Sequence, residues 1–299
     1  MEKPHFQYIE ILIRVKATAV NSADWRLRKA EPFAVRLFFG LRKPKKNILG
    51  GVLSGEVEGV GKDVTLLKMG DQVFGSTGMA FGTYAAYKSL PENGVLALKP
   101  QNITHQEAAV IPFGGLTALH FLKKAHIKSG QKVLIYGASG AVGTAAIQLA
   151  KYFGAHVTGV WSTANLELVK ALGADHVIDY TQEDFTQNGI TYDVIFDTVD
   201  KSLFSPGLKL LNERGILILG AAGLSKMLQG LWVSLTSTRK VITGVISEKA
   251  EDLIFLKELI EAGKLKPVID RTYILAHMAE AHKYVEKGHK KGNVAITIN

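Results

Sequence analysis

The chain of 299 residues has no cysteine, so it can form neither a disulfide nor a zinc site built on thiolates. It also has no apolar run of the roughly 18 residues that span a bilayer, and its N-terminus lacks the apolar core of a signal peptide. We therefore expect a protein of the cytoplasm that has no membrane partner.

Metal-binding motifs are missing as well. The sequence contains no H-E-x-x-H, and the pair His277 and His282 does not have its spacing. Asp193, Asp197 and Asp200 follow one another closely, but strand alternation would spread them over both faces of a sheet. The sequence therefore predicts no metal site.

Acidic residues are too few to balance the basic ones, which leaves a formal net charge of +9. Such a chain either binds nucleic acid or has a basic surface that attracts an anionic cofactor. The two densest basic runs, 42–46 and 287–291, are not interspersed with the aromatic residues that stack on single strands. We predict a basic surface and no nucleic-acid partner.

Short alternating runs separated by glycine turns fill the first hundred residues. In the run from Ile9 to Val20, Ile11, Ile13 and Val15 alternate with polar residues, as in a half-buried strand. Further short strands are predicted at 50–61, 71–75, 82–88 and 95–98. Closely spaced strands of this kind favour an antiparallel, barrel-like domain.

Strands and helices alternate after Thr104. Thr104 and Glu107 have the spacing of a capping box, which predicts a helix at 105–111, followed by a second at 116–125. Beyond them we predict strands at 132–136, 156–160, 177–178, 193–196, 215–219 and 241–245, and helices at 141–153, 165–172, 201–211 and 248–262. This order is typical of an α/β fold with a doubly wound parallel sheet.

The last helix and strand, at 278–286 and 293–298, are expected to return to the first domain. The predicted organisation is therefore a substrate domain at 1–105, an inserted nucleotide-binding domain at 106–264, and a return to the substrate domain at 265–299.

The segment 137–143, GASGAVG, lies between a buried strand and an amphipathic helix, where a dinucleotide-binding loop is expected. Gly140 would let the backbone approach a diphosphate, and Gly143 would let the helix pack on the sheet. The amides that open the helix would bind the phosphates. The alternative is a tight turn that binds nothing. A hydrolase nucleophile elbow at Ser139 is excluded because residue 141 is alanine.

The residues after the second strand of this domain favour NADP(H) over NAD(H). An NAD enzyme needs a carboxylate about 20 residues after the glycines. Residues 159–165, GVWSTAN, contain none, while Ser162 and Asn165 can donate hydrogen bonds to a 2′-phosphate. In the alternative, Ser162, Thr163 and Asn165 only cap the next helix.

Six segments resemble those of a known family. They are AVNSAD at 19–24, the run at 50–61, GDQVFG at 70–75, AAVIPFGGLTAL at 108–119, the glycine loop, and LGADHVIDY at 172–180. With them the chain resembles the medium-chain dehydrogenases/reductases, on the branch of zinc-free quinone oxidoreductases related to zeta-crystallin. The resemblance implies a Rossmann domain inserted into a GroES-like antiparallel β-barrel domain, and a homodimer.

The resemblance also implies which residues bind NADP(H). Around the nicotinamide and pyrophosphate it places Asn21, Thr117, Asn293, Gly140, Ala141 and Val142. Around the adenosine phosphate, and at strand ends that face the cofactor, it places Ser162, Asn165, Tyr180, Val199, Ala221 and Ala222.

Two features depart from the family's pattern. Zinc-dependent relatives carry a Cys and a Gly-His-Glu run as metal ligands, whereas this chain has no Cys and has Gly51 in place of such a histidine. The family also has an opening hairpin of about two strands before the point where this sequence begins, so we expect the substrate domain to be short by an edge.

Hydride transfer without zinc is easiest to the electron-poor carbon of a quinone or enone, because the developing oxyanion is delocalised. We therefore hypothesise NADPH-dependent reduction of a quinone or α,β-unsaturated carbonyl compound. Asn21 would orient the nicotinamide or substrate, and Asp24, with Arg26, would shape the pocket. A purely structural ion pair between Asp24 and Arg26 is the alternative.

Two other functions remain open. One is an NADP-dependent alcohol or aldehyde oxidoreductase. The other is a non-catalytic crystallin-like protein that binds NADPH or associates with RNA. The apolar segments 32–41 and 224–235 are candidates for a lid or a dimer face, although at helical spacing such residues more often belong to the core.

Overall fold

The long strand β1 (Glu10–Val20) is the centre of the first of two sheets. Its residues Ile11, Ile13 and Val15 are buried, as their alternation predicts. On one side β1 pairs with β2 (Val52–Val60). On the other side its first half pairs with β4 (Tyr87–Pro91) and its second half with β13 (Asn293–Thr297). A single strand thus joins segments from both ends of the chain.

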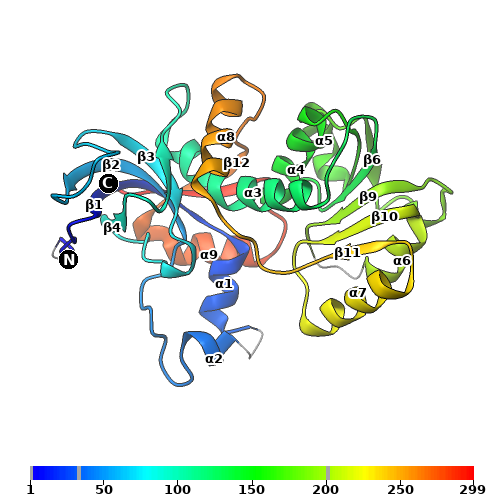
Figure 1. Ribbon diagram of the computed structural model, residues 1–299, viewed down its shortest axis with the longest axis horizontal. Helices are drawn as coiled ribbons and strands as arrows, with labels where there is room; N and C mark the ends of the chain where they lie inside the picture. The colour runs from blue at the N-terminus through cyan, green and yellow to red at the C-terminus, as the bar shows by residue number, and fades with distance from the viewer. Residues whose placement is uncertain (1–2, 32–34, 200–202) are drawn as a thin grey trace. The chain divides into compact units, whose positions relative to one another are not determined.

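The computed structural model describes residues 3–31, 35–199 and 203–299, and it divides into two compact units (Figure 1). The first unit consists of Met1–Phe113 and Glu248–Asn299, and the second is Gly114–Ser247. The sequence predicted domain boundaries at 105/106 and 264/265. The difference at the second boundary is α8 (Ala250–Glu261), which belongs to the first unit, where its Ile260 carbonyl accepts a hydrogen bond from Asn102.

The sheet of the first unit has seven strands in the order β12-β13-β1-β2-β3-β5, with β4 attached to β1. Its other elements are α1 (Ser22–Lys29), α2 (Val35–Phe39), β3 (Gln72–Ser76), η1 (Gly78–Ala80), β5 (Val95–Leu98), β12 (Ile269–Ile274), η4 (Leu275–His277) and α9 (Met278–Glu286). All its pairings are antiparallel except that of β12 with β13, a parallel pair that we did not predict.

The sheet of the second unit has six parallel strands in the order β11-β10-β9-β6-β7-β8, the doubly wound order that the strand–helix alternation predicted. The strands are β6 (Lys132–Tyr136), β7 (His156–Trp161), β8 (His176–Asp179), β9 (Tyr192–Asp197), β10 (Leu211–Leu219) and β11 (Lys240–Ile242). The helices are α4 (Ala141–Tyr152), η2 (Thr163–Asn165), α5 (Leu166–Ala171), η3 (Phe185–Gln187), α6 (Phe204–Leu210) and α7 (Leu224–Thr236).

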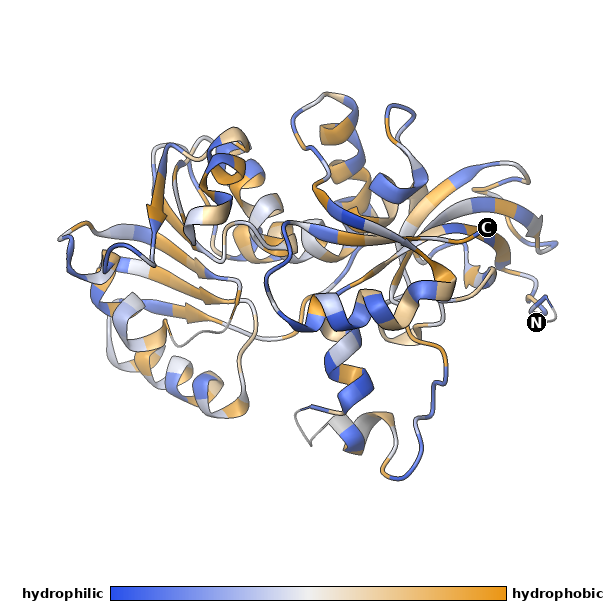
Figure 2. Cartoon of the chain, turned by 180° about the vertical axis from the view of Figure 1, so that it is seen from behind, coloured by the Kyte–Doolittle hydropathy of each residue, from blue (hydrophilic) through white to orange (hydrophobic). Residues whose placement is uncertain are grey.

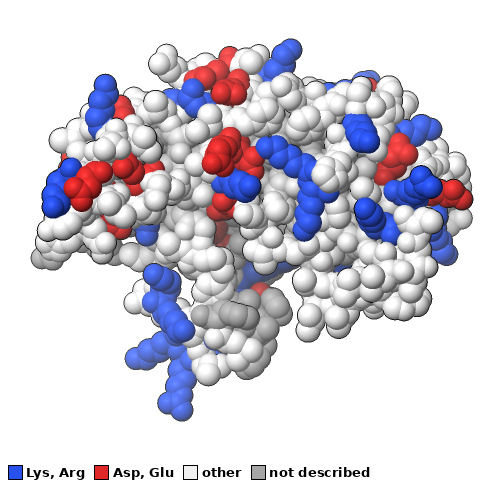
Figure 3. All heavy atoms as spheres, in the orientation of Figure 1, with Lys and Arg blue, Asp and Glu red and all other residues white. Residues whose placement is uncertain are grey.

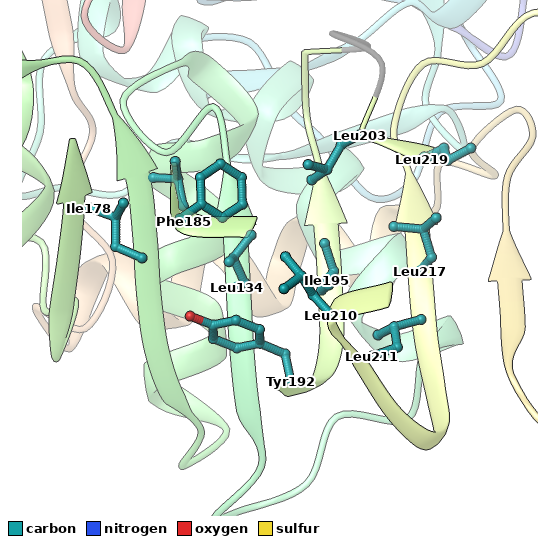
Figure 4. Close-up of a cluster of buried hydrophobic side chains, with 11 residues drawn as sticks. Leu134, Ile178, Phe185, Tyr192, Ile195, Leu203, Leu210, Leu211, Leu217 and Leu219 are labelled. Atoms are coloured by element: carbon teal, nitrogen blue, oxygen red, sulfur yellow. The ribbon is translucent and has the colours of Figure 1, made fainter. Parts of the chain in front are cut away.

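One face of the parallel sheet is covered by a cluster of buried leucine, isoleucine and aromatic side chains (Figure 4). Leu134, Ile195 and Leu217 come from three neighbouring strands and are fully buried. Each such side chain contributes about 1.5 to 3 kcal/mol by its removal from water. The strands themselves are hydrophobic along most of their length (Figure 2), as expected for a parallel sheet covered on both faces.

Two predictions of local structure were wrong, and two helices were missed. The stretch 105–124 forms a single helix, α3 (His105–Lys124), which continues through Pro112. Gly114 lets α3 pack closely, because a Cβ there would lie 2.3 Å from the carbonyl oxygen of Ala141. The strand predicted at 82–88 begins only at Tyr87, since Thr83 and Tyr84 donate their backbone N–H groups to Gly50 and Leu49. Helices α1 and α7 were not predicted.

The prediction that the apolar segment 224–235 belongs to the core was wrong. It lies in α7 with Leu224, Leu228, Leu231, Trp232 and Leu235 all exposed. In the other apolar segment, residues 32–34 are outside the described residues, and Phe39 packs against Phe81 with ring centroids 5.7 Å apart.

Candidate functional site

The glycine loop between β6 and α4 is packed tightly on its inner side. A Cβ on Gly143 would lie 2.2 Å from the carbonyl oxygen of Gly137, so only glycine allows this approach. Gly137 has φ +83°, and a Cβ there would lie 2.5 Å from Thr198 Oγ1 and from Val199 Cγ1. The loop is therefore fixed by contacts that leave no room for side chains.

The outer side of the same loop is open at Gly140. This residue is the N-cap of α4, with φ −76° and ψ 175°, and the nearest atom to a Cβ there is the Gly137 oxygen at 3.4 Å. The first turn of α4 contains no acidic residue. The N–H groups of its opening residues, Ala141 and Val142 among them, have no acceptor within the helix, and the helix dipole is positive here. Unpaired N–H groups at the positive end of a helix suit a diphosphate.

Asn165 supports the glycine loop from the second βα connection. It is buried, and its Nδ2 donates a hydrogen bond to Ser139 Oγ at 3.1 Å. Its Oδ1 is buried with no partner among the described residues. Neither Ser162 nor Asn165 caps a helix with its side chain, so the capping alternative does not explain them. Ser162 is half-buried, and its hydroxyl is not used for capping.

Asp179 is a carboxylate at this edge of the sheet that was not predicted as a site residue. The register of β7 and β8 places it opposite Trp161, at the same end of the sheet as residues 162–165. It accepts hydrogen bonds from Thr163 Oγ1, from Thr181 Oγ1 at 2.6 Å and from the Thr181 N–H at 2.9 Å. These bonds, that of Thr163 first, lower the pKa of Asp179. The sequence does not reveal it, because Asp179 is the last residue of β8 and only the pairing of β7 with β8 brings it beside residues 162–165.

The remaining predicted residues of the second unit are distributed over its strand ends and α3. Val199 follows β9 and donates its N–H to Asp197 Oδ1 at 3.0 Å, while Ala221 and Ala222 follow β10, and all three are half-buried. Because β6, β9 and β10 are neighbours, these residues share the carboxyl edge of the sheet with the glycine loop. Tyr180 is exposed, with its ring 6.2 Å from that of Tyr136, and Thr117 is buried on α3.

In the first unit, the structure brings Asn21 and Asn293 to one edge of the sheet. Val20 pairs with Val294, so the residue after β1 and the first residue of β13 lie side by side. Asn293 donates Nδ2 to the Val268 carbonyl at 3.0 Å. The Oδ1 atoms of both asparagines are buried and lack a partner among the described residues. A buried amide oxygen without a partner is costly, so a donor group of a ligand would satisfy both.

Asp24 supports Asn21 from the first turn of α1. Its carboxylate accepts a hydrogen bond from the Asn21 N–H at 2.8 Å, and Gly50 N–H and Tyr84 OH also donate to it. Burial raises the pKa of Asp24 to about 6 despite these bonds. Arg26 instead lies over the ring of Trp25, 5.6 Å from its centroid, so the alternative of an Asp24–Arg26 ion pair has no support.

Within residues 3–31, 35–199 and 203–299, no group of three His, Cys, Asp or Glu side chains could hold a metal ion. Asp200, which we had considered, lies outside the described residues. No helix in the described part of the chain is long and apolar enough to cross a membrane. On the face seen in Figure 3, basic and acidic side chains are interspersed over most of the surface. The basic run 42–46 is exposed.

Two protein families match the chain. The "alcohol dehydrogenase GroES-like domain" matches residues 7–100, and the "zinc-binding dehydrogenase" matches residues 172–296. The chain is 34% identical to the 2-methylene-furan-3-one reductase of Solanum lycopersicum over 98% of its own length and 73% of the relative's. It is 31% identical to the "NADPH-dependent alkenal/one oxidoreductase, chloroplastic" of Arabidopsis thaliana, over 98% and 73%.

Among solved structures, the chain is similar to the quinone oxidoreductase from Coxiella burnetii, with a TM-score of 0.90 and 30% identity. That match covers 100% of this chain and 93% of the other. The predicted α/β fold, a parallel Rossmann sheet together with a GroES-like antiparallel domain, is therefore confirmed.

Proposed function

The chain belongs to the medium-chain dehydrogenases/reductases, on their quinone oxidoreductase branch, and from this premise we propose that it reduces a quinone or an α,β-unsaturated carbonyl compound with NADPH. The names of the two relatives support an enone as substrate, and that of the Coxiella burnetii protein supports a quinone. The observation that carries the proposal is the open cradle at Gly140, which is rigid on its inner side and free of carboxylates in the turn that follows.

NADPH, when bound, supplies the hydride, and the protein supplies position and electrostatics. We propose that Gly140, Ala141 and Val142 hold the pyrophosphate with backbone N–H groups. Around the adenosine we propose Ser162, Tyr180 and Asn165. Asn165 would act mainly by fixing Ser139 of the loop. Thr163 and Thr181 hold Asp179 in its ionised form, so we propose that the 2′-phosphate lies toward Ser162, away from this carboxylate.

The residues of the first unit would orient the reacting groups. We propose that Asn21 and Asn293 use their unpartnered Oδ1 atoms to bind the nicotinamide carboxamide or the substrate, and that Thr117 contacts the nicotinamide. Asp24 is a positioning residue in this proposal, because its oxygens bind Asn21 and the backbone of Gly50. Val199, Ala221 and Ala222 would line the cofactor without polar side chains.

A catalytic zinc does not fit these residues. The matched family is named for zinc, but this chain has no cysteine, and Gly51 offers no side chain. We therefore propose that the carbonyl oxygen is stabilised by hydrogen bonds instead of by a metal.

The proposal is tested by titrating the protein with NADPH and NADH and then following NADPH oxidation with a benzoquinone and with an α,β-unsaturated ketone. We expect tighter binding of NADPH than of NADH and turnover of at least one substrate class. If neither nucleotide binds, the proposal fails. Activity only with alcohols or aldehydes would favour the alternative oxidoreductase, and salt-sensitive RNA binding without turnover would favour the non-catalytic one.

We further propose a homodimer that forms through α7 and β11. β11 is the end strand of its sheet, and α7 lies close against it through Gly230, where a Cβ would be 2.8 Å from Val241 Cγ1. The exposed side chains of α7 at 224, 228, 231, 232 and 235 offer roughly 100 Å² each. Their sum, about 500 Å², is more than half of the roughly 800 Å² that each partner buries in an interface of standard size.

A further inference from the structure

Glu248 is a half-buried carboxyl group of the first unit to which the proposed function has given no role. It is the first residue after the chain leaves the second unit. Its Oε2 lies 2.7 Å from the hydroxyl of Ser76, the last residue of β3, which is 5% exposed. Burial raises the pKa of Glu248, and the hydrogen bond to Ser76 only partly offsets this. No charged side chain is among the causes of the shift.

The hydrogen bonds around Ser76 favour a neutral Glu248. The Ser76 oxygen lies 3.0 Å from the Gly78 N–H, which donates to it, and 3.2 Å from the Gly51 carbonyl, to which it can donate. A serine hydroxyl has one proton to donate and can accept two. If Glu248 carries a proton and donates it to Ser76, all three contacts are satisfied. If Glu248 is ionised, Glu248 and Gly51 compete for the single Ser76 proton.

The Glu248–Ser76 pair borders an open space in front of Gly51. A Cβ on Gly51 would meet only the carbonyl oxygen of Gly78, at 3.7 Å. The preceding residue, Gly50, donates its N–H to Asp24, the carboxylate that also binds the Asn21 N–H. The backbone at Gly50 and Gly51 is thus linked to Asn21 through Asp24 and to Glu248 through Ser76.

We propose that Glu248, acting through the hydroxyl of Ser76, supplies the proton that completes the reduction of an enone. This inference rests on the proposed function. When the β-carbon of the enone accepts a hydride, the electron pair of its C=C bond moves and the carbonyl oxygen becomes an enolate. The Ser76 hydroxyl turns from the Gly51 carbonyl toward that oxygen, its O–H bond breaks as the proton passes, and the Ser76 oxygen takes the proton of Glu248. The enol formed in this way tautomerises to the saturated carbonyl compound, and the Glu248 carboxylate regains a proton from water.

The same step matters less for a quinone. Its reduction forms a hydroquinone anion whose charge is delocalised over an aromatic ring, so water can protonate the product without a positioned acid. Both substrate classes need hydride transfer, but only the enone needs the proton relay. Comparing the two substrates therefore tests the relay separately from hydride transfer.

The test compares Glu248→Gln with the wild type and with Glu251→Gln, an exposed carboxamide control in the first turn of α8. The Glu248→Gln variant keeps a donor to Ser76 but has no acidic proton. We expect its kcat for an enone to fall about 100-fold, within the usual range for general acid catalysis, with KM little changed. Its kcat for a benzoquinone should stay within about threefold of the wild type. Glu248→Asp should recover part of the enone activity.

Two further measurements exclude a merely structural role. In the wild type, kcat for the enone should fall as the pH rises through the pKa of Glu248, and this limb should be absent from Glu248→Gln. In the protein without ligands, on the acidic side of that limb, infrared spectroscopy should show the C=O band of a protonated carboxyl group that Glu248→Gln lacks and Glu251→Gln retains.

The outcomes distinguish this inference from the proposed function. Unchanged enone turnover in Glu248→Gln, an equal loss with both substrates, or no infrared difference would overturn the proton relay while leaving the proposed function intact. A wild type that binds NADPH but reduces neither substrate would overturn both.

Discussion

Replacing Gly140 by alanine tests whether the open side of the glycine loop is the cofactor cradle. The backbone at Gly140, with φ −76°, is accessible to alanine, and the new Cβ would be 3.4 Å from its nearest neighbour, the Gly137 oxygen. The variant should therefore fold, with a free energy of unfolding within about 1 kcal/mol of the wild type. A loss of NADPH binding larger than this would therefore come from the methyl group blocking the phosphates of the cofactor, and not from damage to the fold.

The expected loss is in NADPH binding. The methyl group would occupy the space in front of the α4 N-terminus, where phosphate oxygens would accept the first N–H groups of the helix. Losing two charge-assisted hydrogen bonds, at about 1.5 kcal/mol each or more, weakens binding by about 3 kcal/mol, which is over 100-fold in Kd. The assay is a fluorescence titration of NADPH, with thermal unfolding measured on the same samples.

Two matched substitutions complete the experiment. Gly223→Ala changes another helix N-cap, with φ −73° and no atom within 4 Å of its Cβ, and should leave the unfolding temperature similarly unaffected. Gly143→Ala would place a Cβ 2.2 Å from the Gly137 oxygen, so it should lower stability, by about 1 to 3 kcal/mol, together with NADPH binding. An NADPH affinity of Gly140→Ala equal to that of the wild type would refute the cradle.

Two other predictions concern stability and assembly. Burial lowers the pKa of His282 to about 4 and raises that of Asp24 to about 6. As the pH falls from 6.5 to 4, His282 therefore lowers the free energy of unfolding by about 3 kcal/mol. Asp24 raises it by about the same amount, because the folded state takes up the proton first. In urea unfolding at pH 7 and pH 5, we expect His282→Asn to gain stability on acidification and Asp24→Asn to lose more than the wild type; parallel curves for all three would contradict this. For the proposed dimer, Leu231→Glu should shift the sedimentation of the protein to that of a monomer, whereas a wild type that is itself monomeric would rule the dimer out.

Much of the second unit could be predicted because its signals are local. A strand with four consecutive apolar or aromatic residues, a glycine loop and an amphipathic helix follow one another within 132–152. Adjacent residues therefore determine both the βα unit and the phosphate-binding end of its helix. The capping box at Thr104 and Glu107 was confirmed for the same reason, with Thr104 N–H 2.8 Å from the Glu107 carboxylate. The course of α3 through Pro112 was not predictable, because it depends on packing at Gly114.

The amino-acid sequence by itself determined the order of strands and helices, the absence of thiolate ligands, and the type of loop that can bind a dinucleotide. Only the tertiary structure decided that Asp179 stands beside Thr163, that α7 turns its leucines outward, and that Glu248 meets Ser76. The physical reason is distance along the chain. Ser76 and Glu248 are 172 residues apart, and nothing in the residues around either one indicates which partner the folded sheet will bring to it.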